Sequence, residues 1–173
     1  MNSIINYTLF LADNALILGQ RNAGWCGHGP VLEQDIAITN ISLDLIGQAR
    51  SLYQYAAELT GNGATEDSLA YLRTEREFKN VLLTEQPNGD WAHTILRQFF
   101  FSTYQYYLYQ VLINHPDSRL AAIAEKSLKE VTYHVRWSSE WVIRLGDGTE
   151  ESNQRLRKAL EALWCYTDEL FMP

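Results

Sequence analysis

The chain has 173 residues, of which 46% are hydrophobic and 12% aromatic, and its 14 Lys and Arg residues face 21 Asp and Glu residues. The resulting net charge of −7 argues against a general nucleic-acid or anionic-membrane binder, because both need a positive surface. The 5 Trp, 10 Tyr and 6 Phe residues need burial, which excludes a disordered chain. The composition predicts an acidic, ordered, single-domain protein.

The two cysteines, Cys26 and Cys165, lie far apart and form neither a disulfide framework nor a Cys-x-x-Cys pattern. The N-terminus has no basic region of the kind that precedes a signal sequence. No apolar run approaches the length of a membrane span. We therefore expect a cytoplasmic protein that does not act at a membrane.

Apolar residues recur at helical spacing along almost the whole chain, and Gly and Pro residues separate the periodic segments. The helices expected in chain order are 5–22, 31–59, 65–86, 88–114, 116–145 and 149–170. Thr65, Asp90 and Asp117 have the residue type and position of helix N-caps. No segment shows the alternation of a strand. The pattern predicts an all-α protein, a ferritin-like four-helix bundle with a crossover helix and an additional C-terminal helix.

The loop Trp25–Pro30 is rich in glycine, which permits tight turns. Trp25 and His28 are expected to anchor this loop to a neighbouring helix. Cys26 lies close to His28, but the loop offers no third group to orient a cysteine nucleophile. The chain also lacks a P-loop, a dinucleotide-binding glycine signature and a G-x-S-x-G elbow.

Bundles of this kind often hold a di-iron centre, whose ligands are a Glu on two helices and Glu-x-x-His on the other two. The sequence contains no Glu-x-x-His. The nearest pairs are Asp90 and His93 at a helix start, and Glu130 and His134, which are four residues apart in the middle of a helix. Glu130 and His134 share a helix face, so they are either metal ligands or a hydrogen-bonded pair.

Asp13 and Asp44 each interrupt an apolar run, and Gly47 stands where a complete site would have histidine. One interpretation is a vestigial metal site made of Asp13, Asp44, Glu130 and His134. The other is that Asp13 and Asp44 are satisfied by an arginine or a backbone group, with Arg97 and Arg136 as examples. We prefer the second, because an unpaired buried carboxylate is costly.

Seven aromatic residues fall within positions 99–109, and on a helix they point in all directions around the axis. The segment is therefore either a central helix buried on every side or a helix at a subunit interface, where Tyr and Phe are enriched. The interface candidates are Phe99, Phe101, Tyr104, Tyr106 and Tyr107.

Six segments, spread in order over essentially the whole chain, resemble the PaaC family. They are residues 11–21, 25–30, 43–50, 85–90, 129–134 and 140–150. PaaC is the non-catalytic subunit of the bacterial phenylacetyl-CoA 1,2-epoxidase, a multicomponent monooxygenase of aerobic phenylacetate catabolism. Family chains usually continue past residues 171–173 with further helices, so the resemblance implies a single ferritin-like domain over residues 1–173 without those C-terminal helices.

The resemblance further implies a structural subunit with no catalytic residues and no cofactor of its own. Its partners would be a PaaA-type catalytic subunit that carries the di-iron centre and binds phenylacetyl-CoA, a small bridging subunit and a flavin/iron–sulfur reductase. Alone, the chain is expected to form a homo-oligomer. The alternative is an active carboxylate-bridged di-iron or di-manganese oxidase that uses Asp13, Asp44, Glu130 and His134 as ligands.

Overall fold

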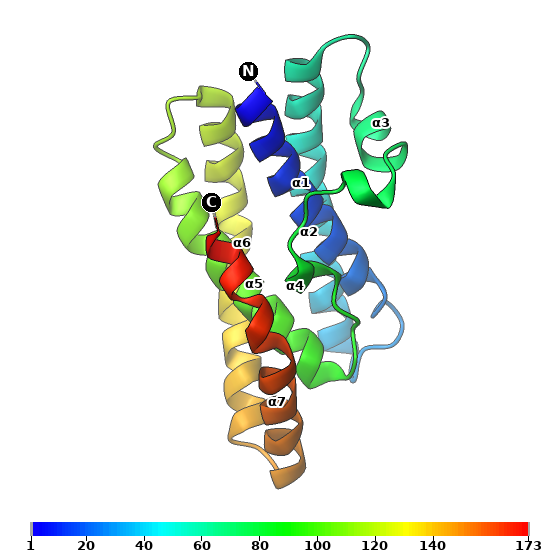
Figure 1. Ribbon diagram of the computed structural model, residues 1–173. Coiled ribbons are helices and arrows are strands. Elements are labelled where there is room, and N and C mark those ends of the chain that lie inside the picture. Colours follow the sequence, from blue (N-terminus) through cyan, green and yellow to red (C-terminus); the bar gives the residue numbers. More distant parts are fainter. Residues whose placement is uncertain (1, 173) are drawn as a thin grey trace.

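A computed structural model describes residues 2–172, and most of them lie in helices (Figure 1). The four long helices are α1 (Asn2–Ala23), α2 (Leu32–Thr60), α5 (Trp91–Leu112) and α6 (Ser118–Gly146), and α7 (Glu150–Leu163) follows them. No strand occurs between residues 2 and 172, so the all-α prediction is confirmed. None of the described helices is both long and apolar enough to cross a membrane.

The long helices form two antiparallel pairs (Figure 1). α1 packs along α2, and α5 packs along α6, each pair being joined by a short loop. The pairs meet where α2 contacts α6, and these helices run in opposite directions. Gln34 at the start of α2 accepts a hydrogen bond from Trp141 near the end of α6, whereas Gln48, further along α2, donates to Glu130, which precedes Trp141 on α6. α7 packs against α5 and α6.

The core lies between the helices of both pairs, and every long helix contributes to it. α6 is amphipathic, with a single apolar stripe directed inward. α5 is instead apolar around most of its circumference, as expected for a central helix. Large side chains buried with almost no exposure come from all four helices: Leu18, Ile38, Ile41, Leu45, Leu52, Ile95, Phe101, Tyr109 and Leu120.

The predicted N-caps are confirmed. The side chain of Thr65 accepts a hydrogen bond from the Ser68 N–H at the start of α3 (Glu66–Tyr71). Asp90 accepts one from the His93 N–H at 2.9 Å, and Asp117 caps the first turn of α6. These caps satisfy N–H groups that have no partner within the helix itself, so local chemistry sets where the helices begin.

The crossover differs from the predicted helix over 65–86. The structure has α3, a 3₁₀ turn (Glu75–Glu77) and α4 (Leu82–Glu85), joined by extended backbone. The Lys79 N–H donates to the Asp13 carboxylate at 2.8 Å, and the Val81 N–H donates to the Asn14 amide oxygen at 2.9 Å. A continuous helix would need those N–H groups for its own carbonyls, so contacts with α1 interrupt it.

The C-terminal segment also departs from the single helix predicted over 149–170. α7 ends at Leu163, and two 3₁₀ turns follow, Trp164–Tyr166 and Asp168–Phe171. Glu169 accepts a hydrogen bond from the Leu82 N–H at 2.7 Å, and Leu170 is buried. These contacts hold the tail against the crossover.

The loop between α1 and α2 is anchored by one of its two predicted residues. The Trp25 indole N–H donates to the Thr94 hydroxyl of α5 at 2.9 Å. His28 is exposed and contacts only the Cys26 carbonyl within its own loop, at 3.1 Å, so its predicted anchoring role is wrong. Cys26, Gly27 and Pro30 around His28 are exposed as well, because this part of the loop lies at the protein surface.

Four tryptophans pack together at the end of the bundle that holds the loop between α1 and α2. The Trp91 ring packs edge-to-face against the rings of Trp25, Trp137 and Trp141, with centroids 5.1, 6.0 and 5.6 Å away. The Gln34 side-chain oxygen accepts hydrogen bonds from Trp137 at 3.1 Å and from Trp141 at 2.7 Å. The cluster therefore connects the first loop, α2, α5 and α6 by apolar contact and paired polar groups.

Candidate functional site

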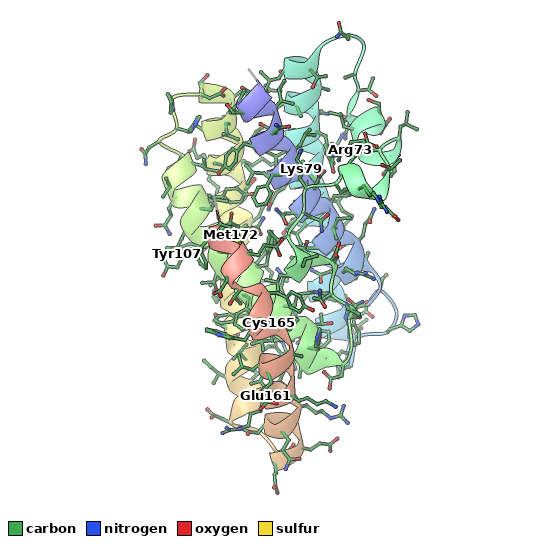
Figure 2. All side chains as sticks on the ribbon, in the orientation of Figure 1. Arg73, Lys79, Tyr107, Glu161, Cys165 and Met172 are labelled. Atoms are coloured by element: carbon green, nitrogen blue, oxygen red, sulfur yellow. The ribbon has the colours of Figure 1, made fainter. Side chains whose placement is uncertain are left out.

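Asp13, the first of the predicted ligand candidates, is fully buried in α1 and is held entirely by protein donors. Its carboxylate accepts hydrogen bonds from the Tyr53 hydroxyl at 2.6 Å and from the Lys79 N–H at 2.8 Å. The Arg73 guanidinium binds both carboxylate oxygens, through Nη1 at 3.1 Å and through Nη2. Figure 2 shows Arg73 and Lys79 on the crossover. Asp13 thus fastens the crossover to α1.

The surroundings of Asp13 explain the electrostatics of this contact. Arg73 also lies over the rings of Tyr53 and Phe78, with its guanidinium carbon 5.6 and 4.3 Å from their centroids. Burial, followed by the negative charge of Asp13, raises the pKa of the Tyr53 phenol far above its usual value. The pKa of Arg73 is also raised, because hydrogen bonding and attraction to Asp13 outweigh the opposing effect of burial. Asp13 and Arg73 therefore form a structural ion pair whose charges are satisfied by protein groups.

Asp44 and His134 meet directly between α2 and α6. His134 is fully buried, and its Nε2 lies 3.0 Å from an oxygen of Asp44. The Asp44 side chain keeps 36% of its surface exposed, so it lies at the edge of the bundle. The other ring nitrogen of His134 has no hydrogen-bond partner among the described residues. The structure therefore brings together two of the four candidates, Asp44 and His134, whereas the predicted hydrogen-bonded pair was Glu130 and His134.

Glu130, four residues before His134, is engaged by a different partner. Its carboxylate accepts a hydrogen bond from the Gln48 amide at 2.9 Å. The Gln48 oxygen in turn accepts one from the Tyr109 hydroxyl at 3.3 Å, and the Gln105 amide lies 3.5 Å away. Burial raises the pKa of the Tyr109 phenol well above its usual value. Residues of α2, α5 and α6 thus form a chain of amide and hydroxyl contacts.

The four predicted candidates therefore fall into three separate hydrogen-bonded groups rather than one cage. Asp44 and His134 share a contact, Glu130 binds Gln48, and Asp13 binds the crossover. Within residues 2–172 no group of three or more His, Cys, Asp or Glu side chains is placed to hold a metal ion. What the arrangement does chemically is link helices through neutral amides and paired charges.

Neither arginine named as an example, Arg97 or Arg136, binds the two aspartates: Asp13 binds Arg73, and Asp44 binds His134. Arg97 is fully buried and donates to the Gln86 carbonyl and, at 2.8 Å, to the Asn88 side chain. Burial, with a smaller contribution from Arg21, lowers the pKa of Arg97 to about 9. Arg136 is exposed and pairs with Glu140 at 3.5 Å. The expectation of an arginine for Asp13 is right in kind, but the residue is Arg73.

The sequence interpretation missed Gln48, Gln105 and Tyr109. A signal was present, because Gln48 follows Asp44 by four residues just as His134 follows Glu130. Two facing helices that each carry such an i, i+4 pair can form two polar contacts with each other, one helical turn apart. Gln105 and Tyr109 show the same spacing on α5.

The aromatic helix α5 has both a buried and an exposed side. Phe101 is buried, Phe99, Tyr104 and Tyr106 are half-buried, and Tyr107 is 65% exposed. Figure 2 shows Tyr107 on the outer side of α5. Next to it lies a groove of about 580 Å³ between α5 and the C-terminal turns, which we call the aromatic groove. Its main lining residues are Phe99, Phe100, Tyr104, Tyr107, Trp164 and Phe171.

Residues 1–173 match the protein family described as "Phenylacetic acid catabolic protein" (PaaA_PaaC). The chain belongs to this family. It is 52% identical, over 171 residues, to a protein of Escherichia coli (strain K12) that is named as one of the subunits of 1,2-phenylacetyl-CoA epoxidase. That alignment covers 99% of this chain and 68% of the relative. The resemblance expected from the six sequence segments is confirmed.

Proposed function

We propose that this chain is the non-catalytic structural subunit of a multicomponent phenylacetyl-CoA epoxidase in aerobic phenylacetate catabolism. Its role is to bind and stabilise the di-iron catalytic subunit. The observation that carries the proposal is the 52% identity, along nearly the whole chain, to a protein whose name makes it a subunit of this epoxidase. Binding that favours the folded catalytic subunit stabilises it by mass action.

The polar interior supports a structural rather than a catalytic role. Four long helices, with a long connection between the second and the third, are typical of a ferritin-like bundle. In a di-metal member of that class the inward carboxylates and imidazoles are free to bind metal. Here Asp13 is neutralised by Arg73, and Glu130 is bound by the amide of Gln48. On this proposal the chain needs no cofactor of its own, and the vestigial site is occupied by hydrogen bonds.

The aromatic groove is the surface that we assign to the catalytic subunit. Exposed Tyr and Phe side chains give large contact areas at low conformational cost, and they are enriched in interface cores. Tyr107, Tyr104 and Phe99 all line this groove. The complete cytoplasmic complex would then contain a PaaA-type di-iron subunit, a small bridging subunit and a reductase.

Co-expression of the tagged chain with a PaaA-type subunit tests this function. We expect a stable complex at micromolar concentration, whose iron content follows the amount of the catalytic subunit. Failure of the two proteins to associate would contradict the structural role. Two firmly bound iron ions on the isolated chain, purified from iron-supplemented cells, would instead support the di-metal oxidase that uses Asp13, Asp44, Glu130 and His134.

A matched pair of variants tests the assigned surface. Tyr107→Glu places a charge beside the aromatic groove, and we expect the affinity for the catalytic subunit to fall at least about tenfold. Ile143→Glu, which changes a similarly exposed side chain on α6, is the control. The assignment of the groove would be contradicted if both variants lost affinity equally, or if neither variant lost affinity.

A further inference from the structure

The dipeptide Asn-Gly occurs twice in the chain, at residues 62–63 and 88–89. An asparagine followed by glycine is open to attack by its own backbone, because the next amide nitrogen can reach the side-chain carbon and glycine has no side chain to hinder it. The attack requires the asparagine side chain to turn toward the following N–H. The structure gives the two dipeptides opposite surroundings, so we expect different fates for them.

The first dipeptide lies at the exposed tip of the loop that joins α2 to α3 (Figure 1). Within residues 2–172 neither the Asn62 side chain nor the Gly63 N–H has a hydrogen-bond partner. A side chain added at Gly61 or Gly63 would meet no atom within 4 Å, so the space around the tip is open. One backbone hydrogen bond closes the turn, from the Ala64 N–H to the Gly61 carbonyl at 3.0 Å. Apart from this turn, nothing among the described residues restrains the two reacting groups.

The backbone at the tip also favours the rotation that the attack requires. Among residues 2–172, Asn62 is the one residue other than glycine with a positive φ, of 52°. This left-handed region is unfavourable for residues with a side chain, so leaving it costs less than leaving a helix or a strand. Gly61 and Gly63 on either side, with φ of 67° and 77°, can follow the rotation without a side-chain clash. The Gly63 nitrogen can therefore turn toward the Asn62 side-chain carbon.

The second dipeptide has the same residues in a fixed setting. The Asn88 side-chain nitrogen donates to the Arg21 carbonyl at 2.8 Å, and the side-chain oxygen accepts from the Arg97 guanidinium at 2.8 Å. The Asn88 backbone carbonyl accepts from the Thr94 hydroxyl at 2.7 Å. Turning this side chain would break contacts with α1 and α5 and leave the fully buried Arg97 without one of its acceptors. Asn88 is therefore protected from the attack.

The charges around the first dipeptide offer little resistance to the reaction. The attacking nitrogen becomes negative when it loses its proton, so nearby carboxylates would slow the step. Three carboxylates line the same shallow surface hollow as the loop tip, those of Glu58, Glu66 and Asp67. Glu58 is paired with Arg119 at 3.2 Å, and Glu66 is paired with Arg50 at 2.9 Å. Two of the three negative charges are thus already balanced.

We propose that Asn62 is a site of spontaneous covalent modification, in which Asn62 and Gly63 form a succinimide that water opens to isoaspartate and aspartate. The Gly63 nitrogen gives its proton to hydroxide and bonds to the Asn62 side-chain carbon. The bond between that carbon and the side-chain nitrogen breaks, and this nitrogen takes up a proton and leaves as ammonia. Water then cleaves one of the two ring C–N bonds. Cleavage at the backbone carbonyl gives isoaspartate, and cleavage at the side-chain carbonyl gives aspartate. Overall, one water is consumed and one ammonia is released.

The products change the joint between α2 and the crossover. Both add a negative charge one residue after Gly61, the C-cap of α2, where the helix dipole already makes negative charge unfavourable. Isoaspartate also lengthens the backbone by one carbon, so the turn that Ala64 closes is lost. The crossover itself stays attached, because Arg73 binds Asp13 independently of the loop. The reaction needs only this chain and water, so it is independent of the proposed function.

Incubation of the folded, full-length chain in mildly alkaline buffer tests the site. After digestion at acidic pH, the peptide that contains residue 62 should be heavier by about one dalton. It should also accept a methyl group from protein isoaspartyl methyltransferase, which does not modify ordinary aspartate. We expect Asn62 to convert at least about tenfold faster than Asn88. Equal rates at the two positions of the folded chain, or no isoaspartate at position 62, would overturn the proposal.

The unfolded chain and one variant are the controls. In urea the two dipeptides should convert at similar rates, because the hydrogen bonds that protect Asn88 are lost. A difference that persists in urea would contradict protection by the fold. Asn62→Gln would have to form a larger ring, so its labelling by the methyltransferase should fall at least about tenfold while the folded state is unchanged by circular dichroism. Labelling that persists in this variant would place the reaction elsewhere and contradict the proposal.

Discussion

Replacing Asp13 by Asn separates a structural carboxylate from a metal ligand. The substitution keeps the shape of the side chain but removes the charge that Arg73 faces, and it leaves the Lys79 N–H opposite an amide. Removing one member of a buried ion pair costs about 3–5 kcal/mol. Because the Arg73 side chain keeps 11% of its surface exposed, we expect the lower end of that range, about 3 kcal/mol.

The loss is measured as the change in the urea midpoint and in Tm. In a chain of this size about 3 kcal/mol corresponds to a Tm decrease of roughly 6–12 °C. The cycle with Arg73→Met isolates the pair. The double variant should be more stable than the sum of the single losses predicts, by about 1–3 kcal/mol, because neither partner is left uncompensated. Asp147→Asn, at an exposed position, is the control and should change stability by less than about 0.5 kcal/mol.

Two results would refute this reasoning. The first is a loss below about 1 kcal/mol for Asp13→Asn, which would mean that the buried carboxylate is not stabilised by its donors. The second is strict additivity of the double variant, which would mean that Asp13 and Arg73 do not interact. A fall in bound metal without a fall in stability would identify Asp13 as a ligand.

Three further predictions concern protonation and packing. Burial raises the pKa of Tyr109, so the native state retains a proton that the unfolded chain releases above about pH 10. The free energy of unfolding should therefore fall as the pH rises past that value. In urea titrations, Tyr109→Phe should make this fall with pH less steep. Burial, followed by the charge of Arg97, lowers the pKa of His93 below its usual 6.5. The unfolded chain therefore binds the proton more readily, stability should fall as the pH drops below about 6.5, and His93→Gln should remove that dependence. Trp91→Phe removes the ring at the centre of the tryptophan cluster and should cost about 1–2 kcal/mol, with a reduced near-ultraviolet circular dichroism signal, whereas an unchanged spectrum would contradict the edge-to-face contacts.

The secondary structure was largely predictable because its signals are local. The 3.6-residue periodicity identified all four long helices, and Thr65, Asp90 and Asp117 marked the starts of helices through their own side chains. Polar residues inside apolar runs correctly indicated contacts between helices. Their chemistry was also anticipated in part, since Asp13 does bind an arginine.

The candidate site was less predictable, because its partners lie far apart in the sequence. Asp13 and Arg73 are separated by 60 positions, and Glu130 and Gln48 by 82. Helical spacing tells which residues share a face, but it does not tell which face of another helix they meet. Charge alone could not choose Arg73, in the crossover, over Arg97, in α5, because the sequence does not show which of these segments lies beside Asp13.

By itself the sequence determined an acidic all-α chain of the PaaA_PaaC family, with its helix starts and its aromatic helix. Periodicity, capping residues and shared sequence segments are properties of neighbouring positions, so they can be recognised without knowledge of the fold. Only the tertiary structure decided where the crossover breaks, how the four ligand candidates divide into three groups and which of the two Asn-Gly dipeptides is held by hydrogen bonds. Those outcomes depend on which helices lie side by side, and the free energy that decides them comes from contacts between distant residues.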